Sequence, residues 1–485
     1  MGLFGNQARL GASNPSGYEI DRSLRVYDSD NTYLNRTPSS TTSRTTWTLS
    51  FWCKRTKIGS TMGLFGTSGS DNNTMTELLF TSGNKFCWQA YNKVYWETTH
   101  EFKDLSAWTH IVVTCDTTNG TQADRMPVYI NGARVTSFST QNLTGSSTDF
   151  GVNRNVEHRI GERPGGSDNF NGYLAEVHFV DGTALNHTSF GETDGDTGAW
   201  VPKKYAGSYG TNGYYLDFKD NSGTTATTLG KDSSGNSNNW TPNNFSVTAN
   251  STANDSVLDT PTNNWATINA LSTHSSMTVE DGNLYMKNPN SGDYSAYATL
   301  PLKAGKKYYI EGVYYQPSGS GSQCYWGITT MGFNGGVATK PNTSGAYSFD
   351  WRGSGGTPEI HNNGSSSTTG SKPANGSVIG MVIDLSAGKM YVHDDNTYYE
   401  SGNPVSGSGQ IISGIPTNQD FYFIAHVDAG GPNVSETRIN FGQQGFQYQP
   451  SGFTDLLKVS EITTPTILTQ TDYFDTVLYT ANGSS

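Results

Sequence analysis

Residues 47–54 read WTLSFWCK, and this stretch decides the fold class of the chain. Apolar side chains at positions 47, 49, 51 and 53 alternate with the polar side chains of Thr48, Ser50 and Lys54. Successive side chains of a β-strand point to opposite faces, so the alternation puts an apolar face against a core and a polar face towards water. The stretch therefore predicts a half-buried antiparallel strand.

The same pattern recurs along the chain, and almost no segment has the periodicity of a helix. Residues 128–135 read VYINGARV, and their central Asn131-Gly132 pair is typical of a tight hairpin turn, because both turn residues must adopt positive φ. Short apolar runs lie between clusters of Gly, Asn, Ser and Asp, which is typical of many short strands. We therefore expect an all-β protein made of sandwiches or barrels.

The composition narrows the range of functions. The chain has 485 residues, a formal net charge of −12 and only 15% charged residues. A nucleic-acid-binding protein normally carries a basic stripe, because contacts with phosphates supply much of its affinity. No such stripe is present in the sequence, and no apolar run approaches the roughly 20 residues of a membrane span. We expect no nucleic-acid partner and no insertion into a membrane.

The cysteines and the first residues bear on cofactors and location. Cys53, Cys87, Cys115 and Cys324 form no CxxC pair, so a zinc site is not expected. Free, mostly buried thiols made in a reducing compartment fit this spacing. The start of the chain lacks the basic region and apolar stretch of a secretory signal. We therefore expect synthesis in a cytoplasm, with no cofactor and no metal.

Strand density divides the chain into segments. Residues 207–262 are dominated by Gly, Ser, Thr and Asn around one clear strand, which predicts a partly ordered interdomain segment. Residues 453–485 are Thr-rich and lack enough apolar residues for a core of their own. We expect an N-terminal arm at 1–20, a first sandwich at 21–206, the interdomain segment at 207–262, a second sandwich at 263–452 and an extended tail at 453–485.

A series of motifs in the first sandwich resembles the laminin-G-like, concanavalin-A-like jelly roll. The motifs appear in order as TLSFW at 48–52, LFG at 64–66, WTHIVVT at 108–114, VYING at 128–132, RIG at 159–161 and FNGYLAEVHF at 170–179. The resemblance implies two antiparallel sheets. It places in the core Trp47, Phe51, Val112, Ile130 and either Leu174 or Val177.

The second sandwich resembles the SPRY domain. Residues 378–393 read VIGMVIDLSAGKMYVH, like the central hairpin of that family, and residues 438–443 read RINFGQ, like its closing strand. Residues 394–397 read DDNT, where the family usually has a Lys-Asn-Gly-like turn. The resemblance implies a non-enzymatic recognition module whose loops bind a protein or another ligand.

Aromatic residues supply the candidate glycan or receptor site. Glycans are often held by stacking on an exposed aromatic face, and residues 86–96 offer aromatic side chains on both sides of a predicted hairpin. The alternative is that these side chains belong to the core or merely lie on the sheet. The candidates are Trp88, Tyr91, Tyr95 and Trp96 in the first sandwich, and Tyr347 and Trp351 in the second.

Carboxylates supply the candidates for catalysis and for calcium binding. Residues 192–198 read ETDGDTG, the nearest match to the paired carboxylates of glucanases, but in a Gly-interrupted loop. We therefore expect no catalytic residues, with Glu192 kept for the alternative of an enzyme. Asp194 and Asp196 could offer oxygen ligands to calcium, but the ligand pattern is incomplete. The histidines have no Ser or Cys partner at a recognisable spacing.

Stretches between and around the sandwiches resemble marine bacteriophage virion proteins, in which the two kinds of module also occur in tandem. These stretches lie at 190–202, 209–218, 232–245 and 259–264. The resemblance implies a non-enzymatic surface protein of the virion, a tail or capsid fibre or appendage, that mediates assembly and host-surface adhesion, with glycans as one class of ligand.

The same resemblance implies partners and location. The partners would be other virion proteins of the capsid, portal or tail, and a glycan or protein of the host surface. A homo-oligomer is expected, with a trimer favoured by analogy with fibres. The arm would dock on the particle through Leu3, Phe4 and Leu10. The alternatives are an enzyme of the virion that depolymerises polysaccharide, and a secreted adhesin.

Overall fold

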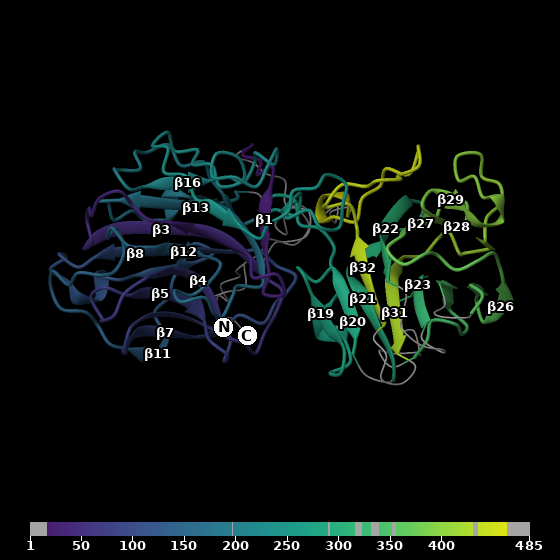
Figure 1. The fold of residues 1–485 in the computed structure, drawn as a ribbon, viewed down its shortest axis with the longest axis horizontal. Coiled ribbons are helices and arrows are strands. Elements are labelled where there is room, and N and C mark those ends of the chain that lie inside the picture. Colours follow the sequence, from purple (N-terminus) through teal and green to yellow (C-terminus); the bar gives the residue numbers. More distant parts are fainter. Residues whose placement is uncertain are drawn as a thin grey trace, which may run out of the picture.

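The computed structural model describes residues 17–195, 197–289, 292–315, 323–330, 339–351, 356–429 and 435–462. Two β-sandwiches lie side by side along the long axis of the molecule (Figure 1). The described helices are single 3-10 turns, and none is long and apolar enough to cross a membrane. They are η1 (Gln122–Asp124), η2 (His187–Ser189), η3 (Ala270–Ser272), η5 (Tyr399–Ser401) and η6 (Val459–Glu461).

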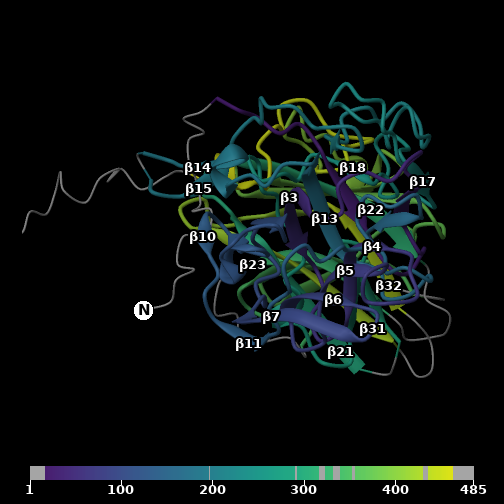
Figure 2. The same ribbon diagram turned by 90° about the vertical axis from the view of Figure 1, so that its left-hand side faces the viewer.

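The first sandwich consists of two antiparallel sheets. One contains, in spatial order, β10 (Ala133–Arg134), β9 (Val128–Ile130), β8 (Thr109–Asp116), β3 (Thr46–Arg55), β13 (Gly172–Asp181), β1 (Ser23–Val26) and β18 (Ser256–Val257), with β16 (Tyr214–Leu216) also paired to β13. The other contains β11 (Phe138–Gln141), β7 (Lys93–Glu101), β6 (Lys85–Ala90), β5 (Thr76–Phe80), β4 (Met62–Thr67), β12 (His158–Ile160), β2 (Tyr33–Arg36) and β17 (Thr241–Asn243). A separate pair, β14 (Gly191–Thr193) and β15 (Trp200–Pro202), lies at the side of this sandwich (Figure 2).

The second sandwich is also antiparallel, so the predicted fold class, all-β with two tandem sandwiches, is confirmed. One sheet contains β19 (Thr278–Glu280), β20 (Tyr285–Asn288), β32 (Ser435–Asn440), β22 (Lys307–Tyr315), β27 (Val378–Asp384), β28 (Lys389–Asp394) and β29 (Thr397–Tyr398), with β30 (Ile412–Ser413) also paired to β28. The other contains β21 (Gly292–Leu302), β31 (Phe421–Ala429), β23 (Gln323–Thr329), β24 (Ala346–Asp350), β25 (Glu359–Asn362) and β26 (Ser365–Thr368).

Both faces of strand β3 are buried, although its sequence alternates between apolar and polar residues. Its apolar side chains, Trp47 and Phe51 among them, enter the main core of the first sandwich, as predicted. The prediction of a polar face open to water is wrong, because Ser50, Trp52 and Lys54 are buried as well. Trp52 packs in a second apolar cluster on the other face of the sheet. Val112, predicted to be in the core, also lies in a cluster separate from the main core.

The segment 207–262 is part of the first sandwich, which corrects the prediction of a partly ordered interdomain segment. It supplies β16, β17 and β18, which pair with β13, β2 and β1. Leu229 and Trp240, between these strands, belong to the main core of the first sandwich. The buried Asp232 ties this segment together, because its carboxylate accepts hydrogen bonds from the backbone N–H of Tyr215 on β16 and from that of the nearby Ser234.

The start of the predicted tail packs on the second sandwich. Phe453 and Leu457 are buried there, and the Asp455 carboxylate accepts a hydrogen bond from the Lys307 backbone N–H at 2.7 Å. The extended tail predicted beyond residue 462 lies outside the described residues.

Hydrogen bonds from buried side chains join the two sandwiches. Lys54 Nζ, on β3, lies 2.8 Å from Asp259 Oδ2 and donates to the Trp265 carbonyl at 3.2 Å. Tyr173 Oη donates to the Gly282 carbonyl at 2.6 Å, and Arg25 Nη1 donates to the Asp281 carbonyl at 3.2 Å. Because these groups are removed from water, the junction is held by bonds that solvent does not replace.

We predict that Lys54→Met destabilises the chain by about 3–5 kcal/mol, because it leaves the Asp259 carboxylate buried without its cation. The matched control is Lys57→Met, which removes the cation of an ion pair with Asp28 whose side chains are 38% and 36% exposed. That change should cost about 0–1 kcal/mol. Urea unfolding of the full chain measures both, and equal effects would contradict the prediction.

Candidate functional site

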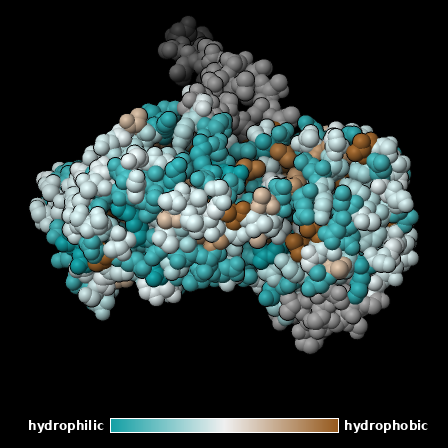
Figure 3. All heavy atoms as spheres, turned by 45° about the horizontal axis from the view of Figure 1, so that its top comes forward, coloured by the Kyte–Doolittle hydropathy of each residue, from teal (hydrophilic) through white to brown (hydrophobic). Residues whose placement is uncertain are grey.

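An open groove of about 660 Å³ lies where the two sandwiches meet. Residues 19–21, which enter the first sandwich, form one part of its wall, and residues 258–265, which cross between the sandwiches, form another. The loop after β32, at 442–449, and residues 456–460 complete it. Figure 3 shows small apolar patches among hydrophilic surface in the region where the two lobes meet.

Trp265 is the largest apolar side chain of the groove. Its side chain is only 3% exposed, and its indole Nε1 is buried without a hydrogen-bond partner among the described residues. Gly442 lets the loop approach the ring, since φ is +115° there and a Cβ atom would lie 2.7 Å from Trp265 Cζ3. Lys458 Nζ lies 5.8 Å from the centre of the ring. The ring is therefore held in a fixed position.

Polar groups surround this ring and Phe446. The Thr262 hydroxyl accepts a hydrogen bond from the Ile20 N–H at 3.0 Å, and Ser460 Oγ donates to Asn263 Oδ1 at 3.2 Å. The groove therefore combines aromatic surface with hydroxyl, amide, carboxylate and ammonium groups. This combination suits a ligand that has flat apolar faces and many hydroxyl groups, such as a saccharide.

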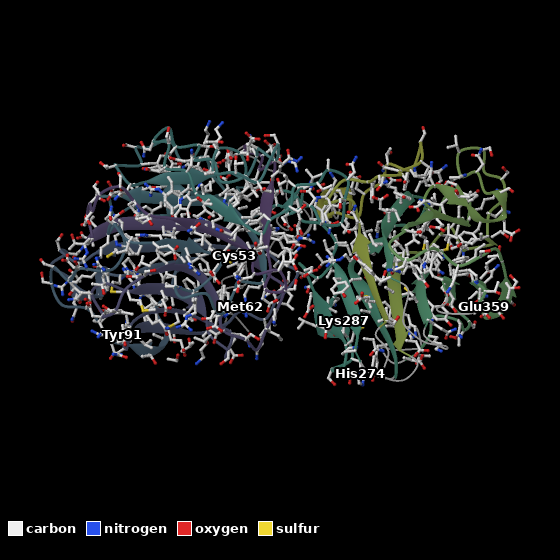
Figure 4. All side chains as sticks on the ribbon, viewed as in Figure 1. Cys53, Met62, Tyr91, His274, Lys287 and Glu359 are labelled. Carbon is white, nitrogen blue, oxygen red and sulfur yellow. The ribbon has the colours of Figure 1, made fainter. Side chains whose placement is uncertain are left out.

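The structure corrects the predicted stacking surface of the first sandwich. Trp88, Tyr95 and Trp96 are at most 3% exposed and lie in the core, where the Trp88 ring is centred 5.2 Å from that of Trp47. A buried ring has no face free for a sugar. Tyr91 is different, because it is 54% exposed in the turn between β6 and β7, at the end of the molecule remote from the second sandwich (Figure 4). Its role in binding stays a prediction.

The two candidates in the second sandwich also lie in the core. Tyr347 is 6% exposed, and Trp351 is fully buried with its ring centred 4.6 Å from that of Phe349. Tyr347 lies on β24 and Trp351 directly follows that strand, and both side chains face the interior because alternate residues of an extended chain point to the same side. The prediction that they contact a glycan or receptor is corrected accordingly.

The acidic candidates are separated from the groove. Glu192 lies on β14 with its carboxylate 3.5 Å from Lys203 Nζ, and Asp194 is buried with Oδ1 accepting the Thr197 N–H at 2.8 Å. These interactions use the two carboxylates within their own hairpin. Asp196, and the predicted docking residues Leu3, Phe4 and Leu10, lie outside the described residues.

A buried serine–histidine pair was missed by the sequence analysis, because Ser50 and His110 lie on neighbouring strands. Ser50 Oγ lies 2.9 Å from His110 Nε2. The indole N–H of Trp200, which can only donate, lies 2.9 Å from His110 Nδ1, so Nε2 carries the proton and donates to the serine. Burial lowers the pKa of His110 to about 3. A nitrogen that donates to the hydroxyl cannot take its proton, so the pair is structural.

A buried glutamate was also missed, although a Glu and a His within the apolar run GYLAEVHFV are a usable signal. Glu176 has φ +50° at a register shift in β13 and accepts hydrogen bonds from Tyr18 Oη and Tyr215 Oη, each at 2.6 Å. Burial opposes its ionisation, but the hydrogen bond from His178 and those from the tyrosines outweigh burial and lower the pKa of Glu176. This network ties residue 18 to the outer face of the sheet.

One cluster has the residue types of a metal site. Potential ligand atoms of Asp350, Glu359 and His361 lie within 4.8 Å of one another on β24 and β25, at the end of the second sandwich remote from the first (Figure 4). Each of the three side chains takes part in further interactions. The cluster therefore supports no metal assignment.

Together, the fold and these sites define an all-β protein of two antiparallel sandwiches with a groove at their junction. Residues 28–189 match a family model described as the concanavalin A-like lectin/glucanases superfamily. The match covers most of the first sandwich and none of the second. A comparison with curated proteins finds no match.

Solved structures resemble parts or most of the chain. The SPRY domain of human HERC1 is 14% identical with a TM-score of 0.27, covering 36% of this chain and 96% of that one. Domains LG4-5 of the mouse laminin alpha1 chain are 10% identical with a TM-score of 0.28, covering 90% and 95%. A candidate carbohydrate binding protein from Bacteroides ovatus is 16% identical with a TM-score of 0.32, covering 47% and 59%.

We predict that the chain loses stability between pH 7 and pH 5. Burial lowers the pKa of His110 to about 3 and that of His158 and His393 to about 4, against 6.5 for a free histidine. At pH 7 these side chains are neutral in the folded and the unfolded chain. Below pH 6.5 the unfolded chain binds protons that the folded chain excludes, so acid favours unfolding.

Thermal unfolding of the chain and of His158→Gln across that pH range tests this prediction. The variant should be less stable at pH 7, because His158 Nδ1 donates to the Val156 carbonyl at 2.8 Å. Its melting temperature should fall less steeply with acid, since one proton-binding group is gone. The same dependence of melting temperature on pH in both proteins would contradict the prediction for His158.

Proposed function

We propose that this chain is a non-enzymatic surface protein of a bacteriophage virion, a tail or capsid fibre or appendage that mediates assembly and adhesion to the host surface. Glycans are the ligand class that we assign to it. The observation that carries the adhesive part is the groove at the junction, in which the partly exposed Phe446 ring lies among polar groups beside the buried Trp265. The virion part is supported by the resemblance of the connecting stretches to marine phage virion proteins.

The junction supports binding by keeping the groove in one shape. Residues from both sandwiches line it, and the buried bonds of Lys54, Tyr173 and Arg25 fix the distance between those walls. A preformed site loses little conformational entropy when its ligand binds. Weak contacts with single sugars can then add up across the copies of an oligomer, for which we favour a trimer.

We predict that Ser460→Trp weakens host adhesion about tenfold or more, equivalent to about 1.4 kcal/mol, because an indole there fills the groove. Ser460 is exposed and lines the groove, so the change removes no core side chain. The matched control is Ser451→Trp, at an exposed position nearby that does not line it. Binding of the labelled full chain to host cells is the measurement, and equal binding by both variants would contradict the role of the groove.

Particle composition tests the virion assignment. Mass spectrometry and antibody labelling of purified particles should find the chain on their surface, and analytical ultracentrifugation should find a trimer. Detection in infected-cell lysate but never on particles would refute the assignment. Sustained release of reducing ends from host polysaccharide, abolished by Glu192→Gln, would instead indicate a depolymerase.

A further inference from the structure

A second, smaller cavity lies between the sheets at one end of the first sandwich. Its volume is about 160 Å³. Cys53 and Arg55 of β3 and Thr109 of β8 form one side, and Phe80 of β5 and residues 100–104 form the other. Glu101, Lys103 and Asp104 are exposed, so the cavity has a mouth at the surface. The cavity shares no lining residue with the junction groove.

Arg55 is a buried cation in this cavity, only 3% exposed. Its Nη1 donates to the Phe102 carbonyl and its Nη2 donates to Asn84 Oδ1 at 3.2 Å, and both acceptors are neutral. Its Nε has no hydrogen-bond partner among the described residues, which also hold no carboxylate within ion-pair distance of the guanidinium. The guanidinium carbon lies 4.4 Å from the centre of the Phe80 ring.

The neighbouring buried cations show what Arg55 lacks. Arg25 lies 2.9 Å from the Asp255 carboxylate, and Lys54 lies 2.8 Å from that of Asp259. Burying a charge without a counter-ion is costly. Burial accordingly lowers the pKa of Arg55 to about 10, with only the Cys53 side chain acting in the opposite direction. The site has a positive charge that an anion would balance.

Of the two carboxylates at the mouth, Glu101 forms an ion pair with Lys103. The Asp104 carboxylate accepts the Ser106 N–H at 2.8 Å and keeps its negative charge at the exposed rim, so the anion's contact with Arg55 lies deeper in the cavity. Thr109, Asn131 and His100 add groups that can hydrogen-bond hydroxyls. The volume corresponds to about five waters at roughly 30 Å³ each. One charged group and part of one sugar ring would fill it.

We propose that this cavity binds the oxyanion group of an acidic saccharide, a carboxylate or a sulfate, with the Arg55 guanidinium as its counter-ion. The inference rests on the proposed function and gives it a ligand class. The guanidinium has N–H groups that the two neutral acceptors do not use, and these donate to an oxygen of the anion, in the manner of arginine–carboxylate pairs. The ring hydroxyls meet the polar side chains nearer the mouth.

Melting temperature and titration calorimetry of the full chain with glucuronate, inorganic sulfate and glucose test the inference. Glucuronate should raise the melting temperature by several degrees and glucose should not. Arg55→Met should abolish the response, whereas the control Arg134→Met, at an exposed arginine paired with Asp124, should keep it. A response to both glucuronate and sulfate would show that the cavity recognises an anionic group without regard to the sugar. A response to glucuronate but not to sulfate would show that it recognises the carboxylate of a sugar. Both support the inference.

A second variant covers the case in which Arg55→Met fails to fold. Ala107 lines the cavity and is partly exposed, so Ala107→Leu narrows the cavity without touching the guanidinium. It should also abolish the response to anions. No response of the unaltered chain to millimolar anion, an equal response to glucose, or a response that survives both Arg55→Met and Ala107→Leu would overturn the inference.

Host-cell binding separates this inference from the proposed function. If Arg55→Met and Ala107→Leu bind host cells as well as the unaltered chain does, the cavity does not contribute to adhesion, and adhesion through the junction groove stands. If the unaltered chain binds no host cells while it still responds to glucuronate, the adhesive function fails and the anion site stands.

Discussion

Buried ion pairs at the junction are the constraint on which the rest of the structure depends. The Lys54–Asp259 pair links the central strand of the first sandwich to the segment that leads into the second. Two further pairs flank it, so that three buried or half-buried cations meet three carboxylates. They are Arg25–Asp255, Lys54–Asp259 and Arg438–Asp281. Arg25–Asp255 lies within the first sandwich and Arg438–Asp281 within the second, so these pairs fix the side chains on each side of the junction. The crossing itself is made by Lys54, Tyr173 and Arg25, which donate to the backbone carbonyls of Trp265, Gly282 and Asp281. Separating the sandwiches would leave these buried donors without their acceptors.

The junction between the sandwiches also determines where a groove lined by residues of both sandwiches can form. Most aromatic side chains of both sandwiches are buried in the cores, as the rings of Trp88 and Trp351 show. Aromatic surface that is partly accessible occurs instead beside the junction, at Phe446, which lines the groove together with the buried Trp265. Arg55 departs from this balance of buried charge, since it lies next to the compensated Lys54 and its described partners are neutral. Arg125, which donates to the carbonyls of Asn119 and Thr144, is a second buried arginine of this kind. Both sites that we propose for ligand binding, the junction groove and the cavity at Arg55, therefore lie where side chains do not fill the space between packed elements.

Much of the fold could be predicted from the sequence. Alternation in residues 47–54 identified a strand and the residues that face the main core, and Asn131-Gly132 identified a turn whose residues have φ of 47° and 78°. The segment 207–262 could not be assigned in this way. Its strands are short and pair with partners far along the chain, as β16 does with β13, so no local pattern records them. The groove was missed because its walls come from four separate segments.

The sequence by itself determined that the chain is all-β and which residues of each strand share a face, because a period of two is a local property of the backbone. Only the tertiary structure decided what covers each face. The alternating sequence around Trp88 would be the same whether its face of the strand were open to water or covered by a second sheet. In the folded chain the second sheet covers that face, and the Trp88 ring is buried against Trp47. Likewise, Lys54 and Arg55 are adjacent and both basic. Within the part of the chain that the structure describes, the fold gave a carboxylate to Lys54 and none to Arg55, since counter-ions come from residues distant in the chain.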